Sequence, residues 1–337
     1  MAERSRKHNN QTFDEVNPFL LTSDSVALYG SHVRGDADAI SDRDILLVSS
    51  NARSLFAETA ALELRGYSSA AYTWNRLRRM AHSGSLFLQH LKHESVIVKD
   101  EECKLETLLN EYSPRVDYSR DIEATKRIIG MLDMVSETKE SLGWAYDVLA
   151  VSVRNLGILE LANRGIYTFS YGQVLSGLAK LGMISATDVE TLRELRHFKS
   201  LYRSEKYSQV PGIRALQSIH RVVTRRFHID TDLRVLRPEK LTELLLHKSA
   251  LHDDKYCRFR LAEGAAIHLV STYRRLDLPC AHRFFNMVRH QNQYGMYLSD
   301  LSKPLHDTAV ELANFTWGQQ SPPPNFSPTA SSEFCEA

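Results

Sequence analysis

Two aspartates, Asp42 and Asp44, stand two residues apart at the start of an apolar run, and their spacing suits the binding of a metal ion. If this run is a β-strand, both side chains point to the same face, with Cα atoms roughly 6–7 Å apart. Two aligned carboxylates bind hard divalent cations through oxygen, and Mg²⁺ favours such a site when a substrate phosphate completes its coordination. We therefore expect a Mg²⁺ or Mn²⁺ site at Asp42 and Asp44.

A Gly-Ser pair, Gly30-Ser31, precedes these aspartates by about ten residues and is suited to contact a phosphate. Glycine lets the backbone approach a phosphate closely. Ser31 adds a hydroxyl and an N–H at the expected start of a short helix, where partial positive charge favours anions. Carboxylates for a metal ion beside a Gly-Ser phosphate site are the parts that metal-assisted nucleotidyl transfer needs.

The stretch YGSHVRGDADAISDRDILLV, residues 29–48, resembles the polymerase-β-like nucleotidyltransferase superfamily. The resemblance is to its bacterial branch of minimal and kanamycin-nucleotidyltransferase-like members. The shared pattern is a hydrophobic residue, Gly-Ser, about ten residues, and then Asp-x-Asp followed by apolar positions. It includes the Arg34-Gly35 turn and agrees with the expected order of elements over residues 20–100.

This resemblance implies a transferase that uses an NTP or a dNTP. In the superfamily two metal ions bind the triphosphate, and one lowers the pKa of an acceptor hydroxyl that attacks the α-phosphorus and expels pyrophosphate. By resemblance, Gly30 and Ser31 hold the triphosphate, while Asp42 and Asp44 bind both metal ions and are the catalytic residues. Related enzymes often reach the triphosphate with a lysine from the helical part. Lys199 is the expected one here, with a solvated basic face as the alternative.

One part of the family pattern is missing, because active members usually carry a third carboxylate on the next strand. That strand is expected to be YSSAAYTW, residues 67–74, and it contains no acid. Glu94 or Asp100 could substitute from a neighbouring element, although neither stands where the pattern asks for it. A missing ligand weakens the metal ion that activates the nucleophile. Two functions therefore stay open: an active transferase, and a catalytically inactive fold that binds a protein partner as an antitoxin would.

The distribution of charge bears on the acceptor. The formal net charge of the chain is +1, yet residues 191–290 hold 20 Lys and Arg against 10 Asp and Glu. Such an excess attracts polyanions, unless it only reflects the Arg-rich solvent faces of helices. We therefore expect a nucleotide, an oligonucleotide or a nucleic-acid end as the acceptor, rather than a cationic aminoglycoside. Protein AMPylation shares the chemistry and differs only in its acceptor.

The resemblance also suggests a biological setting. Bacterial relatives of this size often act in anti-phage defence or in toxin–antitoxin pairs. A protein partner encoded alongside this chain is therefore a further expectation, and it comes from the resemblance alone.

The elements that must position these residues are expected to form an α/β part followed by helices. Short β-prone runs at residues 25–29, 43–50 and 67–74 predict a small mixed sheet, and residues 54–65 have helical spacing with Ser54 as the N-cap. From about residue 118 onward, apolar residues recur at three- and four-residue steps, which predicts further helices.

These patterns predict four segments. They are an N-terminal arm over residues 1–17, an α/β nucleotidyltransferase domain over residues 18–115, a mainly α-helical domain on the substrate or partner side over residues 116–318, and a Pro/Ser-rich disordered tail over residues 319–337.

The composition is that of a globular protein, with 43% hydrophobic and 25% charged residues. No run of about 18 uncharged apolar residues occurs, so no membrane-spanning helix is expected. The polar first residues do not resemble a secretory signal, and the four cysteines lie far apart without a CxxC pair. We expect a cytoplasmic protein with no membrane partner and no thiolate metal site.

Overall fold

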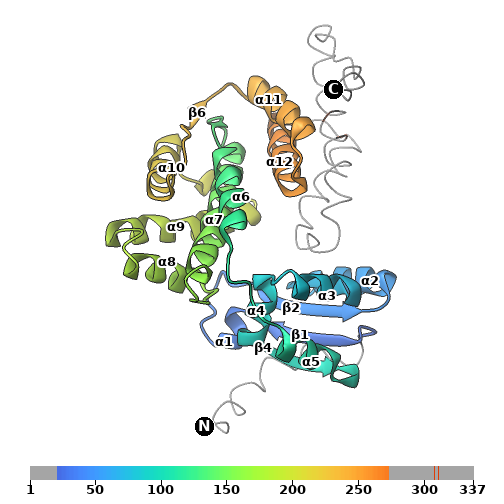
Figure 1. Ribbon diagram of the computed structural model, residues 1–337. Coiled ribbons are helices and arrows are strands. Elements are labelled where there is room, and N and C mark those ends of the chain that lie inside the picture. The colour runs from blue at the N-terminus through green and yellow to red at the C-terminus, as the bar shows by residue number, and fades with distance from the viewer. Residues whose placement is uncertain (1–20, 273–306, 308–309, 311–337) are drawn as a thin grey trace, which may run out of the picture. The chain divides into compact units, whose positions relative to one another are not determined.

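The computed structural model describes residues 21–272, 307 and 310, and it divides the chain into two compact units. Among the described residues, the first unit runs to Val235 and the second begins at Leu236. Figure 1 follows the chain from the sheet through the helices of the first unit, and then to the helices of the second.

A four-stranded mixed sheet forms the centre of the α/β part, with strand order β3-β2-β1-β4. β1 (Ser25–Tyr29) pairs antiparallel with both β2 (Arg43–Ser49) and β4 (Ser95–Asp100), and β3 (Tyr67–Thr73) runs parallel to β2 at one edge. The central strands β1 and β2 are covered on both faces, which is why their sequences are nearly continuous apolar runs. α2 (Ala52–Glu63) supplies the crossover that the parallel pair requires.

Helices cover both faces of this sheet. α2 packs on one face through Leu55 and Leu62. The opposite face is covered by α3 (Trp74–His82), α4 (Leu86–Glu94) and α5 (Lys104–Glu111). The α/β part is completed by the short helix α1 (Ser31–Arg34) and a 3₁₀ turn over Glu101–Cys103.

The helical part that follows is built around α7 (Lys139–Ala162), which is buried along most of its length. Its other elements are α6 (Ser119–Gly130), α8 (Tyr171–Lys180), α9 (Ala186–Arg203), a 3₁₀ turn over Tyr207–Gln209, α10 (Ile213–Phe227), and the paired short strands β5 (Met134–Val135) and β6 (Arg234–Val235). Two glycines of α7 let neighbouring helices approach closely. A Cβ at Gly143 would lie 3.0 Å from the ring of Tyr202, and one at Gly157 would collide with Val174.

The second unit contains α11 (Pro238–Leu251) and α12 (Lys255–Thr272). α11 begins with a proline, whose missing N–H has no partner to lose in the first turn of a helix. The hydroxyl of Ser249 donates to the carbonyl of Arg258 at 2.9 Å, which joins the two helices.

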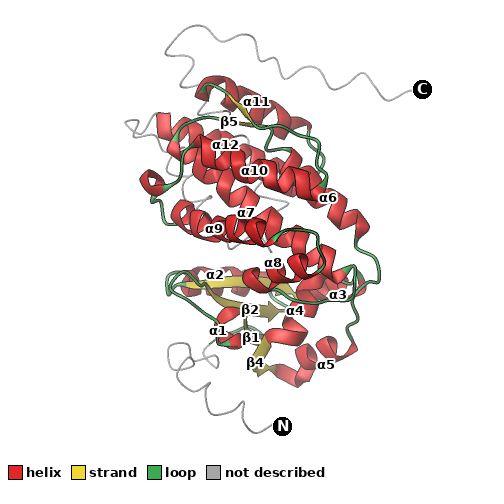
Figure 2. Cartoon of the chain, turned by 90° about the vertical axis from the view of Figure 1, so that its left-hand side faces the viewer, coloured by secondary structure: helices red, strands yellow, loops and turns green. Residues whose placement is uncertain are grey.

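The expected succession of a small mixed sheet with helices and then a mainly helical part is confirmed, as Figure 2 shows by colour. The N-cap of α2 was wrongly predicted. The helix begins before Ser54, and the side chain of Asn51 accepts a hydrogen bond from the N–H of Arg53.

The expected boundary near residue 115 lies between α5 and α6, inside the first compact unit. The arm expected over residues 1–17 and the tail expected over residues 319–337 lie outside the described residues, as does the end of the expected helical domain. A search of the described residues finds no helix with the length and apolar character to cross a membrane.

Candidate functional site

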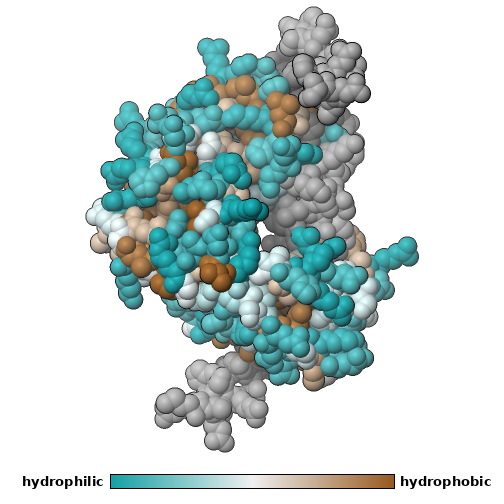
Figure 3. All heavy atoms as spheres, in the orientation of Figure 1, coloured by the Kyte–Doolittle hydropathy of each residue, from teal (hydrophilic) through white to brown (hydrophobic). Residues whose placement is uncertain are grey.

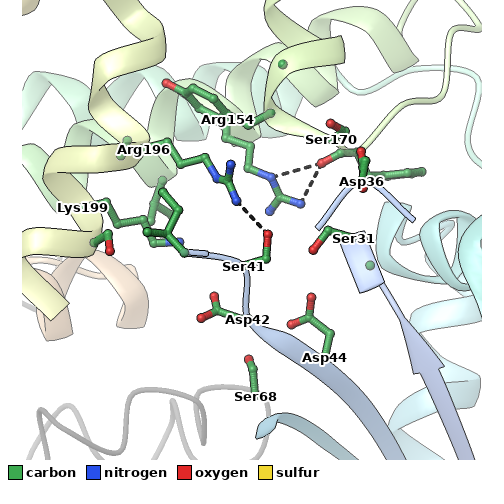
Figure 4. A pocket seen from close by; sticks show the side chains of 18 of the residues that line it. Ser31, Asp36, Ser41, Asp42, Asp44, Ser68, Arg154, Ser170, Arg196 and Lys199 are labelled. Atoms are coloured by element: carbon green, nitrogen blue, oxygen red, sulfur yellow. Dashed lines mark hydrogen bonds between the residues drawn. The ribbon is translucent and has the colours of Figure 1, made fainter. Parts of the chain in front are cut away.

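The first unit contains a cleft of about 680 Å³ where one end of the sheet faces α7, α9 and the segment over residues 169–172. The turn that joins β1 to β2 forms its floor, and Figure 4 shows the basic side chains of the helices across from it. All five residues singled out from the sequence line this cleft: Gly30, Ser31, Asp42, Asp44 and Lys199.

The two aspartates point into the cleft from the start of β2 (Figure 4). In the strand register Asp44 lies opposite Tyr29 of β1 and Ser68 of β3. Alternate residues of a strand share a face, so Asp44 is on the face of Leu46, and Asp42 precedes it with the same parity. The structure thus brings both carboxylates to one end of the sheet.

The surroundings of Asp44 raise its pKa from 3.8 to about 6. Burial is the largest cause, and the negative charge of Asp42 acts in the same direction. Arg154, a hydrogen bond from Ser68 and the charge of Lys199 lower it again, but they do not cancel the effect. A cation placed between the carboxylates would offset both causes of the shift, so this pair fits a hard divalent ion.

This shift predicts how metal binding depends on pH. A proton and a cation compete for Asp44, so we expect the affinity for Mn²⁺ to be level above about pH 6 and to fall below it. The loss should approach roughly tenfold per pH unit. Isothermal titration calorimetry with Mn²⁺ between pH 5 and pH 8 measures it. An affinity that stays constant over this range would contradict the role of Asp44 as a ligand.

Two features require a glycine at position 30, namely its backbone conformation and the lack of space for a side chain. Its φ of +81° is one that L-residues rarely adopt, and a Cβ at this position would overlap Oδ2 of Asp44. Ser31 follows at the start of α1, and its hydroxyl faces the same cleft (Figure 4). The Gly-Ser pair therefore leaves open the space directly beside the carboxylate.

Four basic side chains line the opposite wall. Arg154 extends from α7, whereas Arg196, Lys199 and Arg203 extend from one side of α9, where residues three, four and seven apart are neighbours. The guanidinium of Arg154 donates two hydrogen bonds to the carbonyl of Phe169, at 3.3 and 2.9 Å. Within the described residues, neither Arg154 nor Lys199 forms an ion pair with a carboxylate.

Burial lowers the pKa of Lys199 to about 8, and the charge of Arg203 lowers it further, against the opposing charges of Asp147 and Asp42. Arg203 itself is paired with the buried Asp147 at 2.9 Å. Lys199 is thus still mostly protonated at neutral pH, in surroundings that disfavour its charge. An anion bound in the cleft would add negative charge beside Lys199 and so stabilise its protonated form.

Arg196 ties the turn between α1 and β2 to the helical wall. Its guanidinium donates to both carboxylate oxygens of Asp38, at 2.5 and 2.9 Å, and to the hydroxyl of Ser41 at 3.0 Å. These hydrogen bonds hold the pKa of Asp38 down, at about 2. The contact fixes the residues just before Asp42 relative to α9.

The two acids considered as replacements for the missing carboxylate are engaged elsewhere. Glu94 accepts from Arg34 and pairs with His90, whose nitrogen lies 2.9 Å away. Asp100 accepts from the hydroxyl of Ser25 and from two backbone N–H groups at the start of α5. Neither belongs to the carboxylate pair. Ser68 is the β3 residue that lies beside Asp44.

No group of three or more His, Cys, Asp or Glu side chains within the described residues is arranged to hold a metal ion. Any divalent ion at this site would therefore be held by two carboxylates and completed by other oxygen ligands. The hydroxyls of Ser31 and Ser68 and the phosphates of a bound nucleotide have the right chemistry for that.

Arg154 is a cleft residue that the sequence patterns did not single out. Its signal is that it is the one arginine of α7, a helix whose other residues are mostly buried, and a charged side chain is rarely placed there without a partner or a role. Comparison with known proteins finds no family model, no curated protein and no solved structure that matches this chain.

Proposed function

We propose that this chain is a Mg²⁺-dependent nucleotidyltransferase that moves an NMP from an NTP or a dNTP to a hydroxyl. One observation carries the proposal: Asp42, Asp44 and the Gly30-Ser31 turn lie together in a cleft whose opposite wall holds basic side chains. This arrangement supplies ligands for a cation and partners for several phosphates in the same space. The resemblance of residues 29–48 to the polymerase-β-like superfamily supports the same reaction.

The residues divide the work by their chemistry. Asp42 and Asp44 would hold Mg²⁺ or Mn²⁺, with two ions expected together with the NTP, and such ions would supply Lewis acidity at the acceptor hydroxyl and positive charge for the phosphates. Gly30 admits a phosphate next to Asp44, and Ser31 offers it a hydroxyl. Lys199, together with Arg154, faces the triphosphate from the helical wall.

The transfer forms one bond to phosphorus and breaks another. The acceptor oxygen forms a bond to the α-phosphorus, and the bond from that phosphorus to the bridging oxygen breaks. Pyrophosphate leaves with the electron pair of that bond, and the hydroxyl proton is released to solvent. The basic wall favours a nucleotide or a nucleic-acid end as the acceptor, because an aminoglycoside would meet Arg154, Arg196 and Lys199.

The test is to incubate the purified protein with each labelled NTP and dNTP in the presence of Mg²⁺ or Mn²⁺. Pyrophosphate, labelled nucleotide products and labelled protein are measured in the same reactions. We expect pyrophosphate from the wild type and none from the Asp42→Ala/Asp44→Ala variant. Label on the protein itself, seen by intact mass, would identify AMPylation instead. Failure of the wild type both to release pyrophosphate and to bind any nucleotide with metal would overturn the proposal.

A second function, nucleotide binding without turnover by a fold that serves a protein partner, is favoured by the serine at position 68. Ser68 lies beside Asp44 on β3, where the family pattern calls for an acid. If the site lacks only that acid, Ser68→Asp or Ala70→Asp on the same face of β3 should raise pyrophosphate release at least about tenfold. A wild type that binds NTP silently, with activity appearing in a variant, would establish this second function.

Lys199 provides a further prediction. Lys199→Met should raise the KM or Kd for NTP by about tenfold to a hundredfold, because it removes a charged donor to phosphate. The loss should shrink as the pH is raised from 7 to 10, since the pKa of Lys199 is about 8 and the wild-type amine becomes neutral. The matched control is Lys180→Met, an exposed lysine at the end of α8 outside the cleft. Equal effects of both substitutions would contradict the role of Lys199.

A further inference from the structure

The hydroxyl of Ser68 is hydrogen-bonded to the carboxylate of Asp44. Ser68 is the second residue of β3, and the parallel register with β2 places it directly opposite Asp44. Its side chain is partly exposed and lines the cleft, whereas its neighbours Tyr67 and Ser69 are buried. A primary hydroxyl that is open to the cleft is therefore held against one of the two carboxylates proposed to bind the divalent ion.

Ser68 lies on the far side of the carboxylates from the basic wall. In Figure 4 the two aspartates lie between Ser68 on one side and Arg154 and Lys199 on the other. Displacement at phosphorus is in line, so the attacking oxygen and the departing pyrophosphate take opposite sides of the α-phosphorus. Pyrophosphate bound by the cations of the wall would depart on one side, which leaves the side of Ser68 for the attacking hydroxyl.

The other hydroxyl groups of the cleft are less well placed for this attack. Ser41 accepts from Arg196 at 3.0 Å and donates to Asp38 at 2.9 Å, so its hydroxyl is already engaged. The ring of Tyr29 is buried, and Ser31 belongs to the turn proposed to hold phosphate. The remaining hydroxyls come from the opposite wall, where pyrophosphate would be bound: Ser170, Tyr171, Ser200 and Ser204.

Exposure to solvent would not by itself select an acceptor on this protein. Figure 3 shows hydrophilic side chains over much of the visible surface of the α/β part. Ser50 and Ser83 are exposed, and Ser68 is less exposed than either of them. What distinguishes Ser68 is its contact with Asp44, because a serine becomes a useful nucleophile only beside groups that activate it.

We infer that Ser68 is itself an acceptor for the proposed transfer, so that the protein attaches one NMP to its own cleft when no other acceptor is bound. Oγ of Ser68 forms a bond to the α-phosphorus, and the bond from that phosphorus to the bridging oxygen breaks. Pyrophosphate leaves with the electron pair of that bond, and the hydroxyl proton is released to solvent. This inference rests on the proposed function.

The modification inactivates the chain that carries it. The product is a phosphodiester that keeps the nucleotide beside Asp44, in the space that the next NTP needs. Each chain therefore modifies itself once and then stops. Ser68 lies inside the cleft, where the cleft of a second copy does not reach it, so the reaction is intramolecular and its rate does not depend on protein concentration.

The test incubates the full chain with Mn²⁺ and each NTP in turn, labelled on the α-phosphate, without an added acceptor. Intact mass and peptide mapping should find up to one NMP per chain, on the peptide that contains Ser68, and no label from NTP labelled on the γ-phosphate. Ser68→Ala should lower the label at least about tenfold, whereas Ser68→Thr, which keeps a hydroxyl, should retain it. Ser200→Ala is the matched control, because it removes a cleft hydroxyl from the opposite wall and should leave the label unchanged.

A mixing experiment tests whether the transfer stays within one chain. A tagged Asp42→Ala/Asp44→Ala variant keeps Ser68 but lacks both carboxylates, and it is mixed with the active Ser68→Ala variant. The tagged chain should remain unlabelled. Label on its Ser68 would show transfer between molecules and would overturn the intramolecular reaction.

The outcomes separate this inference from the proposed function. Unchanged label in Ser68→Ala, or label on other residues, would overturn the role of Ser68. So would a wild type that releases pyrophosphate with an added nucleotide or oligonucleotide but never labels itself, and the proposed function would then stand. If Ser68→Ala fails to bind NTP with Mn²⁺, peptide mapping of the wild type and of Ser68→Thr decides the question. A wild type that neither binds NTP nor releases pyrophosphate would overturn both proposals.

Discussion

Asp44→Asn is expected to abolish pyrophosphate release and, at the same time, to make the protein more stable. The activity loss should be on the order of 10²–10³-fold or more, because the substitution removes one of the two carboxylates proposed to hold the divalent ion. The gain in stability follows from the pKa of Asp44, which folding raises from 3.8 to about 6. An asparagine at this position has no charge to bury and can still accept a hydrogen bond from Ser68.

Proton linkage determines that ionisation of Asp44 destabilises the folded state. Between pH 4 and pH 6 the folded state holds a proton at Asp44 that the unfolded state has released, so this group's contribution to stability is lost as the pH rises through that window. Above it, the ionised carboxylate costs about 3 kcal/mol, at 1.36 kcal/mol for each pKa unit. The unfolding temperature of Asp44→Asn at pH 7.5 should therefore exceed that of the wild type by about 6–12 °C.

Differential scanning calorimetry without and with Mn²⁺ measures these unfolding temperatures and so tests the prediction. Mn²⁺ should raise the unfolding temperature of the wild type and leave that of Asp44→Asn unchanged, because only the wild type can bind the ion tightly. Asp38→Asn is the matched control. The pKa of Asp38 is held down by Arg196, so neutralising it should not stabilise the protein. A variant at position 44 that is less stable than the wild type at pH 7.5 would contradict the account of its burial.

Gly30→Ala is expected to disable the site through a single methyl group. Its Cβ would overlap Oδ2 of Asp44, so the carboxylate must turn away from its place beside Asp42. A displacement of about 1 Å in a catalytic group costs on the order of 10²-fold in rate, and we expect at least that loss of pyrophosphate release. Binding of Mn²⁺ should weaken in parallel.

Gly35→Ala is a close control for this substitution. Gly35 has nearly the same φ, +79° against +81°, so the backbone strain on adding a Cβ is comparable. No atom lies within 4 Å of the position that its Cβ would take. Both variants should lose about 1 kcal/mol of stability from strain, but only Gly30→Ala should lose metal binding and activity. Thermal unfolding and Mn²⁺ calorimetry on the two proteins give the comparison. Similar losses of Mn²⁺ affinity would show that strain, and not the contact with Asp44, is responsible.

Much of the α/β part could be predicted because its signals are local. The β-prone run at residues 25–29 is β1, and the run beginning at Arg43 is β2. The segment SVIVKD, which could be read as a strand or as the end of another element, is β4. The N-cap of α2 was wrongly predicted because Asn51 and Ser54 are both good N-cap residues. No local feature of the sequence distinguishes between them.

The availability of the third acid could not be predicted. Glu94 and Asp100 each carry a carboxylate near the end of an element, and sequence alone treats them alike. In the folded chain Glu94 meets Arg34 and His90, and Asp100 caps α5, so neither is free to join Asp44. Such competition for a side chain depends on which elements pack together.

The pair of carboxylates and the glycine beside them follow from the local sequence. Asp42 and Asp44 share a face because of the two-residue period of a strand, and Gly30 comes near them because β1 and β2 are neighbours in both sequence and sheet. The basic side chains on the other wall of the cleft follow instead from tertiary packing. Arg154 and Lys199 reach the cleft through the packing of α7 and α9, and Arg196 meets Asp38 across 158 residues of chain. Contacts over such separations follow from the burial of apolar faces far from the site, and no local pattern encodes them.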